Sequence, residues 1–149
     1  MVVTLSDTAR QYIALFEDET GATARDCVVF EDERDGDDAP DERVVFLVKP
    51  GDMGRAIGSG GENVRKVEGQ LGRDVTLVED ADTPEDFVAN ALAPAAVHNV
   101  TVSEGDETVA YAEVDTEDTG VAIGEGGRNI LAAEKLAKRH YDIDDIQLT

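Results

Sequence analysis

Cysteine is nearly absent from this sequence of 149 residues, which has Cys27 and no other. One thiol cannot form a disulfide within the chain, and it cannot build a cysteine-based metal site. Free cysteine usually packs as a small hydrophobic residue. Because Cys27 opens the apolar run C-V-V-F, we expect it to be buried in a strand.

Long apolar runs are missing as well, and no stretch reaches the roughly 18 apolar residues of a membrane-spanning helix. The first residues, M-V-V-T-L-S-D, lack the basic region and following apolar stretch of a secretory signal. We therefore expect a soluble cytoplasmic protein that makes no contact with a membrane.

Positive charge is scarce, because 13 Lys and Arg residues stand against 34 Asp and Glu residues, for a formal net charge of −21. Such self-repulsion weakens a compact fold in dilute buffer, but it is screened when the Debye length falls to about 3 Å at 1 M salt. We therefore expect a salt-rich cytoplasm. Disorder is the competing interpretation of so acidic a chain, but the hydrophobic content of 41% favours a folded protein.

The apolar pattern predicts a first unit over residues 1–80. Ser6 can cap a helix with helically spaced apolar residues, and Gly21 can end that helix. An acidic segment, 31–42, is expected to form a solvated loop between the first two strands. The elements expected after the helix are strands at 27–30 and 44–48, a short helix at 54–58, a helix at 63–71 and a strand at 74–79.

The same order of elements is predicted for a second unit over residues 81–149. Thr83 and Pro84, followed by two acidic residues, form a typical helix N-terminus, with a hydroxyl cap and acids at the positive end of the dipole. The elements expected next are strands at 97–102 and 107–114, a short turn before a glycine stretch, a helix at 128–141 and a strand at 145–148.

The clearest functional signal is a glycine-rich stretch that occurs twice. Ala56–Val64 reads A-I-G-S-G-G-E-N-V, and 66 positions later Ala122–Ile130 reads A-I-G-E-G-G-R-N-I. Glycines between two helices permit positive φ and close backbone approach, and the following helix offers unpaired N–H groups. This combination is typical of phosphate binding. A tight turn between helices, without a ligand, is the alternative.

Two common nucleotide-binding motifs do not fit the repeated stretch. Neither copy contains the G-K-S/T of a P-loop, and a short helix instead of a strand precedes each loop. Asn63 and Asn129 occupy the place of the third glycine of a dinucleotide fingerprint. The phosphates of a nucleic-acid strand remain as the expected ligand.

The I-G-x-G-G stretch between two helices resembles the G-x-x-G loop of KH domains, which clamps about four nucleotides of a single strand. The helix and strand before each core resemble the prokaryotic type II arrangement. The segment 82–95 resembles the inter-domain joint of the NusA family, in its short archaeal form. The resemblance implies an α+β fold of two tandem type II KH domains, each a three-stranded sheet covered by helices.

By this resemblance the protein is a transcription factor that binds single-stranded RNA, without catalysis, and acts in elongation or termination on nascent RNA. RNA polymerase is a candidate second partner, and a monomer without cofactor or metal is expected. The residues expected to bind RNA lie in and beside the two loops: Arg55, Ile57, Gly58, Ser59, Gly60, Gly61, Asn63, Arg65, Lys66, Gly124, Glu125, Gly126, Gly127, Arg128 and Asn129.

The placement of positive charge agrees with this interpretation. Residues 54–73 hold four cationic and two acidic side chains, as do residues 119–141, so each segment carries +2 and the rest of the chain carries −25. Cations are therefore concentrated where a phosphate chain would lie. Four apolar residues would either contact bases or belong to the core: Ile57, Val64, Ile123 and Ile130.

The two loops differ at their variable position, which is Ser59 in the first copy and Glu125 in the second. A carboxylate beside a phosphate costs affinity. We therefore expect the first loop to be the better RNA site.

Other interpretations of the sequence remain open. A protein-interaction adaptor would use the acidic surface and bind little RNA. A nucleotide-dependent enzyme lacks the motifs named above, and neither His98 nor His140 lies in a pattern that implies catalysis. Residues 31–42 have an EF-hand-like spacing of acids, but Glu31 replaces the usual Asp and strands are expected on both sides.

Overall fold

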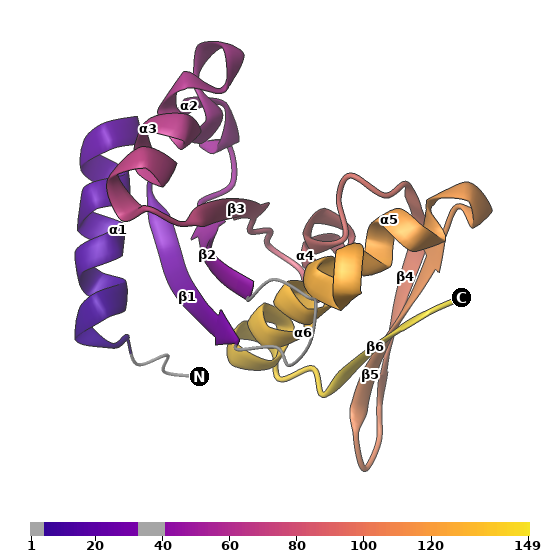
Figure 1. The fold of residues 1–149 in the computed structure, drawn as a ribbon. Coiled ribbons are helices and arrows are strands. Elements are labelled where there is room, and N and C mark those ends of the chain that lie inside the picture. Colours follow the sequence, from indigo (N-terminus) through magenta and orange to yellow (C-terminus); the bar gives the residue numbers. More distant parts are fainter. Residues whose placement is uncertain (1–4, 33–40) are drawn as a thin grey trace. The chain divides into compact units, whose positions relative to one another are not determined.

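The computed structural model describes residues 5–32 and 41–149. The chain divides into two compact units, one over Thr4–Glu79 and the other over Asp80–Thr149. Each unit has a three-stranded sheet, of order β1-β2-β3 in the first and β4-β5-β6 in the second (Figure 1). With helices on each sheet, the predicted α+β fold of two repeated units, each with a three-stranded sheet, is confirmed.

The first unit begins with α1 (Asp7–Thr20), whose ends follow from local chemistry. The Ser6 hydroxyl accepts the N–H of Ala9 at 3.1 Å, which satisfies one of the unpaired donors at the helix start. At the other end Gly21 takes the left-handed conformation, with φ 75°, and donates its N–H to the Glu17 carbonyl. Both predicted caps are thus confirmed.

The first sheet pairs β1 (Ala24–Asp32) antiparallel to β2 (Asp41–Val48), and β2 parallel to β3 (Asp74–Glu79). The parallel pair needs a crossover, which consists of α2 (Met53–Ile57), the short turn η1 (Ser59–Gly61) and α3 (Glu62–Leu71). The first glycine loop lies inside this crossover.

The acidic segment predicted as a loop over 31–42 has its ends in strands, because the β1–β2 pairing continues through the Asp32–Asp41 pair. That part of the prediction was wrong: backbone pairing continues beyond the apolar residues that marked the strands. Residues 33–40 lie outside the part of the chain that the structure describes.

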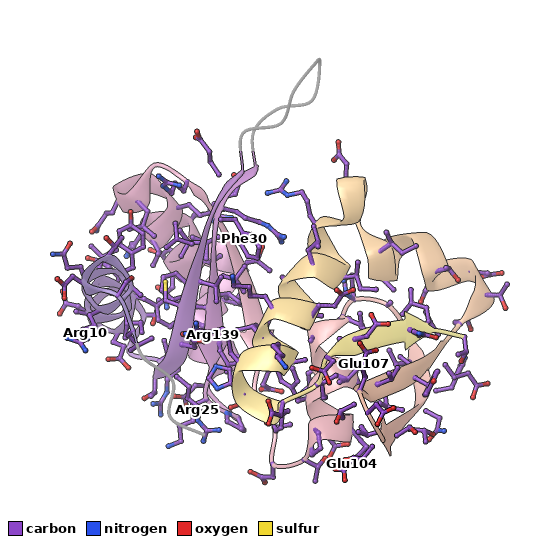
Figure 2. All side chains as sticks on the ribbon, turned by 90° about the horizontal axis from the view of Figure 1, so that it is seen from below. Arg10, Arg25, Phe30, Glu104, Glu107 and Arg139 are labelled. Carbon is purple, nitrogen blue, oxygen red and sulfur yellow. The ribbon has the colours of Figure 1, made fainter. Side chains whose placement is uncertain are left out.

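The core of the first unit lies between its sheet and its helices, and α1 runs along the sheet in Figure 1. Phe16 of α1 stacks on Phe46 of β2 with ring centroids 4.4 Å apart. Cys27 belongs to this core and is 4% exposed, which confirms the predicted buried thiol. Phe30 lies near the end of β1 and is labelled in Figure 2. The Arg43 guanidinium lies over its ring, 4.6 Å from the centroid.

The second unit repeats the order of the first. Thr83 accepts the N–H of Asp86 at 3.2 Å, and Pro84 opens the helix, as its sequence predicts. The antiparallel pair β4–β5 and the parallel pair β5–β6 match those of the first sheet. Its elements are α4 (Pro84–Ala91), β4 (Val97–Glu104), β5 (Thr108–Val114), η2 (Thr116–Asp118), α5 (Thr119–Ile123), η3 (Glu125–Gly127), α6 (Arg128–Tyr141) and β6 (Asp145–Leu148).

An aromatic contact ties the start of the second unit to its long helix. Phe87 of α4 stacks on Tyr141 of α6 with centroids 4.8 Å apart. The Tyr141 hydroxyl donates toward the carboxylate of the buried Asp80, at 2.7 Å, and lies 2.8 Å from the Ala81 carbonyl. These contacts fix the segment that precedes α4.

Within residues 5–32 and 41–149, none of the helices has both the length and the apolar character needed to cross a membrane.

Candidate nucleic-acid interface

The two glycine loops have the same backbone conformation. The dihedral angles φ and ψ are 74° and 175° at Gly58, and 80° and 168° at Gly124. The middle glycines, Gly60 and Gly126, agree within 2°. The third glycine of each loop is left-handed, with φ 80° in both copies. The sequence repeat is therefore also a structural repeat.

The first glycine of each loop is required for two physical reasons. Its dihedral angles fall in a region that is essentially open only to glycine. A Cβ atom on Gly58 would also lie 2.7 Å from Cγ of Asn63, and one on Gly124 would lie 2.7 Å from the backbone N of Asn129. The chain thus packs against itself at these positions, and this contact closes the loop.

The side chains of Asn63 and Asn129 hold the loops together from within. Asn63 donates its Nδ2 to the Arg55 carbonyl at 2.7 Å. Asn129 donates to the Ala122 carbonyl at 3.1 Å and lies 3.3 Å from the Leu92 carbonyl. Both were predicted among the RNA-binding residues; their amides face the loop backbone, so they position it.

One aspartate before each loop accepts a backbone hydrogen bond from an earlier part of its unit, and sequence reasoning missed both aspartates. Asp52 accepts the N–H of Thr23 at 2.9 Å, and Asp118 accepts the N–H of Ala96 at 2.8 Å. The two residues are 66 positions apart, the same offset as the glycines. Extending the comparison of the repeats a few residues upstream would have found them.

The helix that follows each loop presents its positive end to the glycines. α3 has 10 residues and α6 has 14, and their N-caps, Gly61 and Gly127, make no side-chain capping bond. The first-turn N–H groups of a helix have no partner within the helix, and their dipoles favour an anion. Each loop therefore offers backbone donors where a phosphate could approach.

Around the first loop, exposed side chains add positive charge. Arg55 and Ser59 are exposed, as is Gly60 at the tip. Arg65 lies over the loop and donates Nη1 to the Gly60 carbonyl at 2.8 Å, while Lys66 pairs with the Glu62 carboxylate at 3.4 Å. The structure thus brings the predicted residues of this loop together on one short segment.

The isoleucine before each loop is exposed, whereas the apolar residue after it is not. Ile57 is 42% exposed and Ile123 is 38% exposed, and Val64 and Ile130 are half-buried. Of the two roles expected for these four positions, core packing is excluded for Ile57 and Ile123. Their side chains are available to a ligand.

The second loop has different side chains on the same backbone. Leu131 stands where the first loop has Arg65, and its Cδ1 lies 3.9 Å from the position that a Cβ on Gly127 would take. Glu125 is exposed at the tip. Glycine geometry is retained here, but the charge that favours phosphate is reduced.

Further along α6, one of the cations that give residues 119–141 their positive charge is neutralised locally. Lys138 lies 2.6 Å from the Asp144 carboxylate and 3.9 Å from that of Asp142. The hydrogen bond to Asp144 raises the pKa of Lys138, and the same bond lowers the pKa of Asp144. This lysine therefore fixes the turn after α6 and adds little field at the loop.

α6 also carries Glu134, whose surroundings disfavour the ionised form of its carboxyl group. Partial burial raises the pKa of Glu134, and the nearby charge of Asp145 raises it further. Ionised Glu134 therefore opposes folding slightly.

A metal site finds no support in the described ranges, 5–32 and 41–149, where no group of three or more His, Cys, Asp or Glu side chains could hold an ion. Most of the EF-hand-like segment lies outside them. His98 contacts the Asp115 carboxylate at 3.4 Å, as a surface pair.

Comparison with protein families matches both parts of the chain. Residues 84–149 match the family described as NusA-like second KH domain, and residues 11–106 match the family described as KH domain. A solved structure, the crystal structure of APE1850, aligns with a TM-score of 0.82 and 28% identity, over 97% of this chain and 100% of that chain.

Relatives from three organisms carry one name. The chain is 61% identical over 149 residues to the "Probable transcription termination protein NusA" of Halobacterium salinarum, and the match covers 100% of both. It is 60% identical over 148 residues to the protein of that name from Halococcus morrhuae, with 99% of each covered. The relative from Methanocaldococcus jannaschii is 36% identical over 137 residues, which cover 91% of this chain and 69% of the relative.

Proposed function

Because the chain belongs to the NusA family of KH-domain transcription termination proteins, we propose that it binds single-stranded RNA and acts on the nascent transcript during elongation and termination. The observation that carries this proposal is the first glycine loop. Its backbone donors lie at the positive end of α3, and the exposed Arg55 is in the short helix that leads into it.

Binding at this loop would begin with the phosphate backbone. Gly60 and Ser59 are exposed at the tip, and a Cβ on Gly60 would meet no atom within 4 Å, so a phosphate can approach the backbone there. Arg65 already contacts the Gly60 carbonyl and places a guanidinium beside that phosphate. The exposed Ile57 would then contact the base or sugar that follows.

High salt weakens ionic contacts to phosphates, so the affinity there must come from other contacts. Affinity for a single strand falls with a slope of about 0.7 per neutralised phosphate on a logarithmic salt scale. Relatives from Halobacterium and Halococcus and the net charge of −21 support a salt-rich cytoplasm. We infer that backbone N–H groups and apolar contacts supply most of the affinity there.

The variant Ser59→Asp with Gly60→Asp tests the proposal. Both positions are exposed, and a Cβ on Gly60 would meet no atom within 4 Å, while Asp tolerates the left-handed conformation better than most residues. We expect circular dichroism to stay unchanged and binding to labelled single-stranded RNA to be lost in a filter assay. Unchanged RNA affinity would remove the first loop from the site.

RNA polymerase remains a proposed second partner, supported by the name that the relatives share. The acidic adaptor stays an alternative because the chain outside the two loop segments carries −25. Filter binding separates the RNA-binding factor from the adaptor, because an adaptor would show little affinity for single-stranded RNA even with both loops unaltered.

A further inference from the structure

The two glycine loops share a backbone but differ in the side chains that surround it. In the first loop, arginines flank a neutral tip; in the second, apolar residues flank an acidic tip. The positions that carry this contrast, each pair 66 residues apart, are Arg55 and Val121, Ser59 and Glu125, and Arg65 and Leu131; Glu62 and Arg128 differ in the opposite sense. Because the dihedral angles of the glycines agree within 7°, the difference lies in the chemistry of the surface and not in the fold.

The charge around the two loops has opposite sign. Residues 49–65 hold three cationic and two acidic side chains, which gives +1. The equivalent residues 115–131 hold one cationic and four acidic side chains, which gives −3. A phosphate chain that approached the second loop would meet net repulsion, whereas a positively charged segment would be attracted.

Apolar surface is concentrated at the second loop. In the part of the chain that the structure describes, five large hydrophobic side chains are exposed, and three of them flank this loop. We name these three the apolar rim: Val121 (43% exposed), Ile123 (38%) and Leu131 (44%). Leu131 lies against Gly127, at the place where Arg65 covers the first loop.

We propose that the second glycine loop is a docking surface for a partner protein, which binds through apolar side chains flanked by Lys or Arg. The charge of −3 disfavours RNA and favours a basic segment, while the apolar rim supplies contact area that salt does not screen. A second copy of this chain is a poor occupant because each copy carries −21. The proposal goes beyond RNA binding and does not depend on the first loop.

The test uses the full chain, labelled with ¹⁵N, in molar KCl. The probe is a synthetic helical peptide of about 15 residues, with leucines on one face and lysines on the other. We expect it to shift the amide signals of residues 119–131, whereas single-stranded oligouridine shifts those of residues 53–65. If oligouridine shifts 119–131 as strongly as 53–65, the second loop is an RNA site and the proposal is overturned.

Variants separate apolar docking from general attraction to an acidic protein. Val121→Ser with Leu131→Ser changes two exposed residues and no charge, so folding should be retained and peptide affinity should fall tenfold or more, about 1.4 kcal/mol. Ile57→Ser is the matched control at the first loop, with similar exposure of 42%, and should leave peptide affinity unchanged. Equal peptide binding by the wild type and the Val121→Ser, Leu131→Ser variant would overturn the proposal.

A graft provides a gain-of-function measurement on the same backbone. The triple variant Val121→Arg, Glu125→Ser, Leu131→Arg gives the second loop the three side chains that distinguish the first in this comparison, and leaves Arg128 in place. We expect this variant to lose the peptide and to gain oligouridine shifts at 119–131. A graft that still binds the peptide as well as the wild type would contradict the assignment.

Discussion

Replacing Gly58 by alanine tests the loop architecture most sharply. Its dihedral angles, φ 74° and ψ 175°, cost a non-glycine residue about 1–3 kcal/mol. The new Cβ would also lie 2.7 Å from Cγ and 2.9 Å from the backbone N of Asn63, well inside the roughly 3.5–4.0 Å of a normal carbon contact. We therefore expect Gly58→Ala to lower the free energy of unfolding of the first unit by about 3 kcal/mol or more.

Two neighbouring glycines provide matched controls for the same substitution. Gly60 is left-handed, with φ 62°, but has open space around it, so Gly60→Ala should cost only about 1–2 kcal/mol. Gly54 lies in α2 without a positive φ, and a Cβ added there would meet no atom within 4 Å. Gly54→Ala should therefore be neutral or stabilise by up to about 1 kcal/mol.

Urea unfolding of the three variants in molar KCl, followed by circular dichroism, measures this series. One kcal/mol corresponds to about 4–8 °C in melting temperature for a unit of this size, so thermal melting is a second readout. Adding Asn63→Ala to Gly58→Ala should not restore stability, because the backbone N of residue 63 stays 2.9 Å from the new Cβ. If Gly58→Ala costs no more than Gly60→Ala, the packing of Asn63 under the first glycine does not define the loop.

Three further predictions concern charge. Glu125→Lys should raise affinity for single-stranded RNA, because it replaces the like charge at a loop whose backbone already suits phosphate; flat titrations at moderate salt would show that this loop makes no RNA contact. Glu134→Gln should stabilise the protein at pH 7, because the pKa of Glu134 is raised in the folded state and its ionised form is therefore disfavoured there. The stability that protonated Glu134 gives the wild type is fully present below about pH 4.3 and is lost as pH rises through the folded-state pKa. The urea midpoints of variant and wild type should therefore converge in acid. Lowering KCl from multimolar to about 0.1 M should loosen or unfold the protein, since −21 charges lose their screening, and a melting temperature independent of KCl would refute this.

The features that the sequence predicts best are those determined by a few adjacent residues. Ser6 and Thr83 cap their helices as expected, and the loop glycines take the positive φ that their spacing indicated. Strand ends were less predictable, because β1 and β2 pair through acidic residues as far as Asp32 and Asp41. Hydrophobicity marks where a strand is buried, and backbone pairing continues beyond that point.

The roles of individual loop residues depended on contacts that composition does not reveal. Asn63 and Asn129 are predicted to bind RNA, and the structure adds a role that composition does not reveal: their amides bond to carbonyls 8 and 7 residues away in the chain. Likewise, the sequence does not distinguish the exposed Ile57 from the half-buried Val64, because both are apolar and both lie beside the glycines. Helix geometry around the loop decides which one faces outward.

Crosslinking RNA to the full chain in native-salt cell extract, followed by mapping of the crosslinked peptides, tests the central claim most directly. RNA binding at the first loop predicts crosslinks in the segment from Arg55 to Lys66, and their loss in the Ser59→Asp, Gly60→Asp variant. An extract in which RNA crosslinks nowhere on the chain, or only outside that segment, would contradict it.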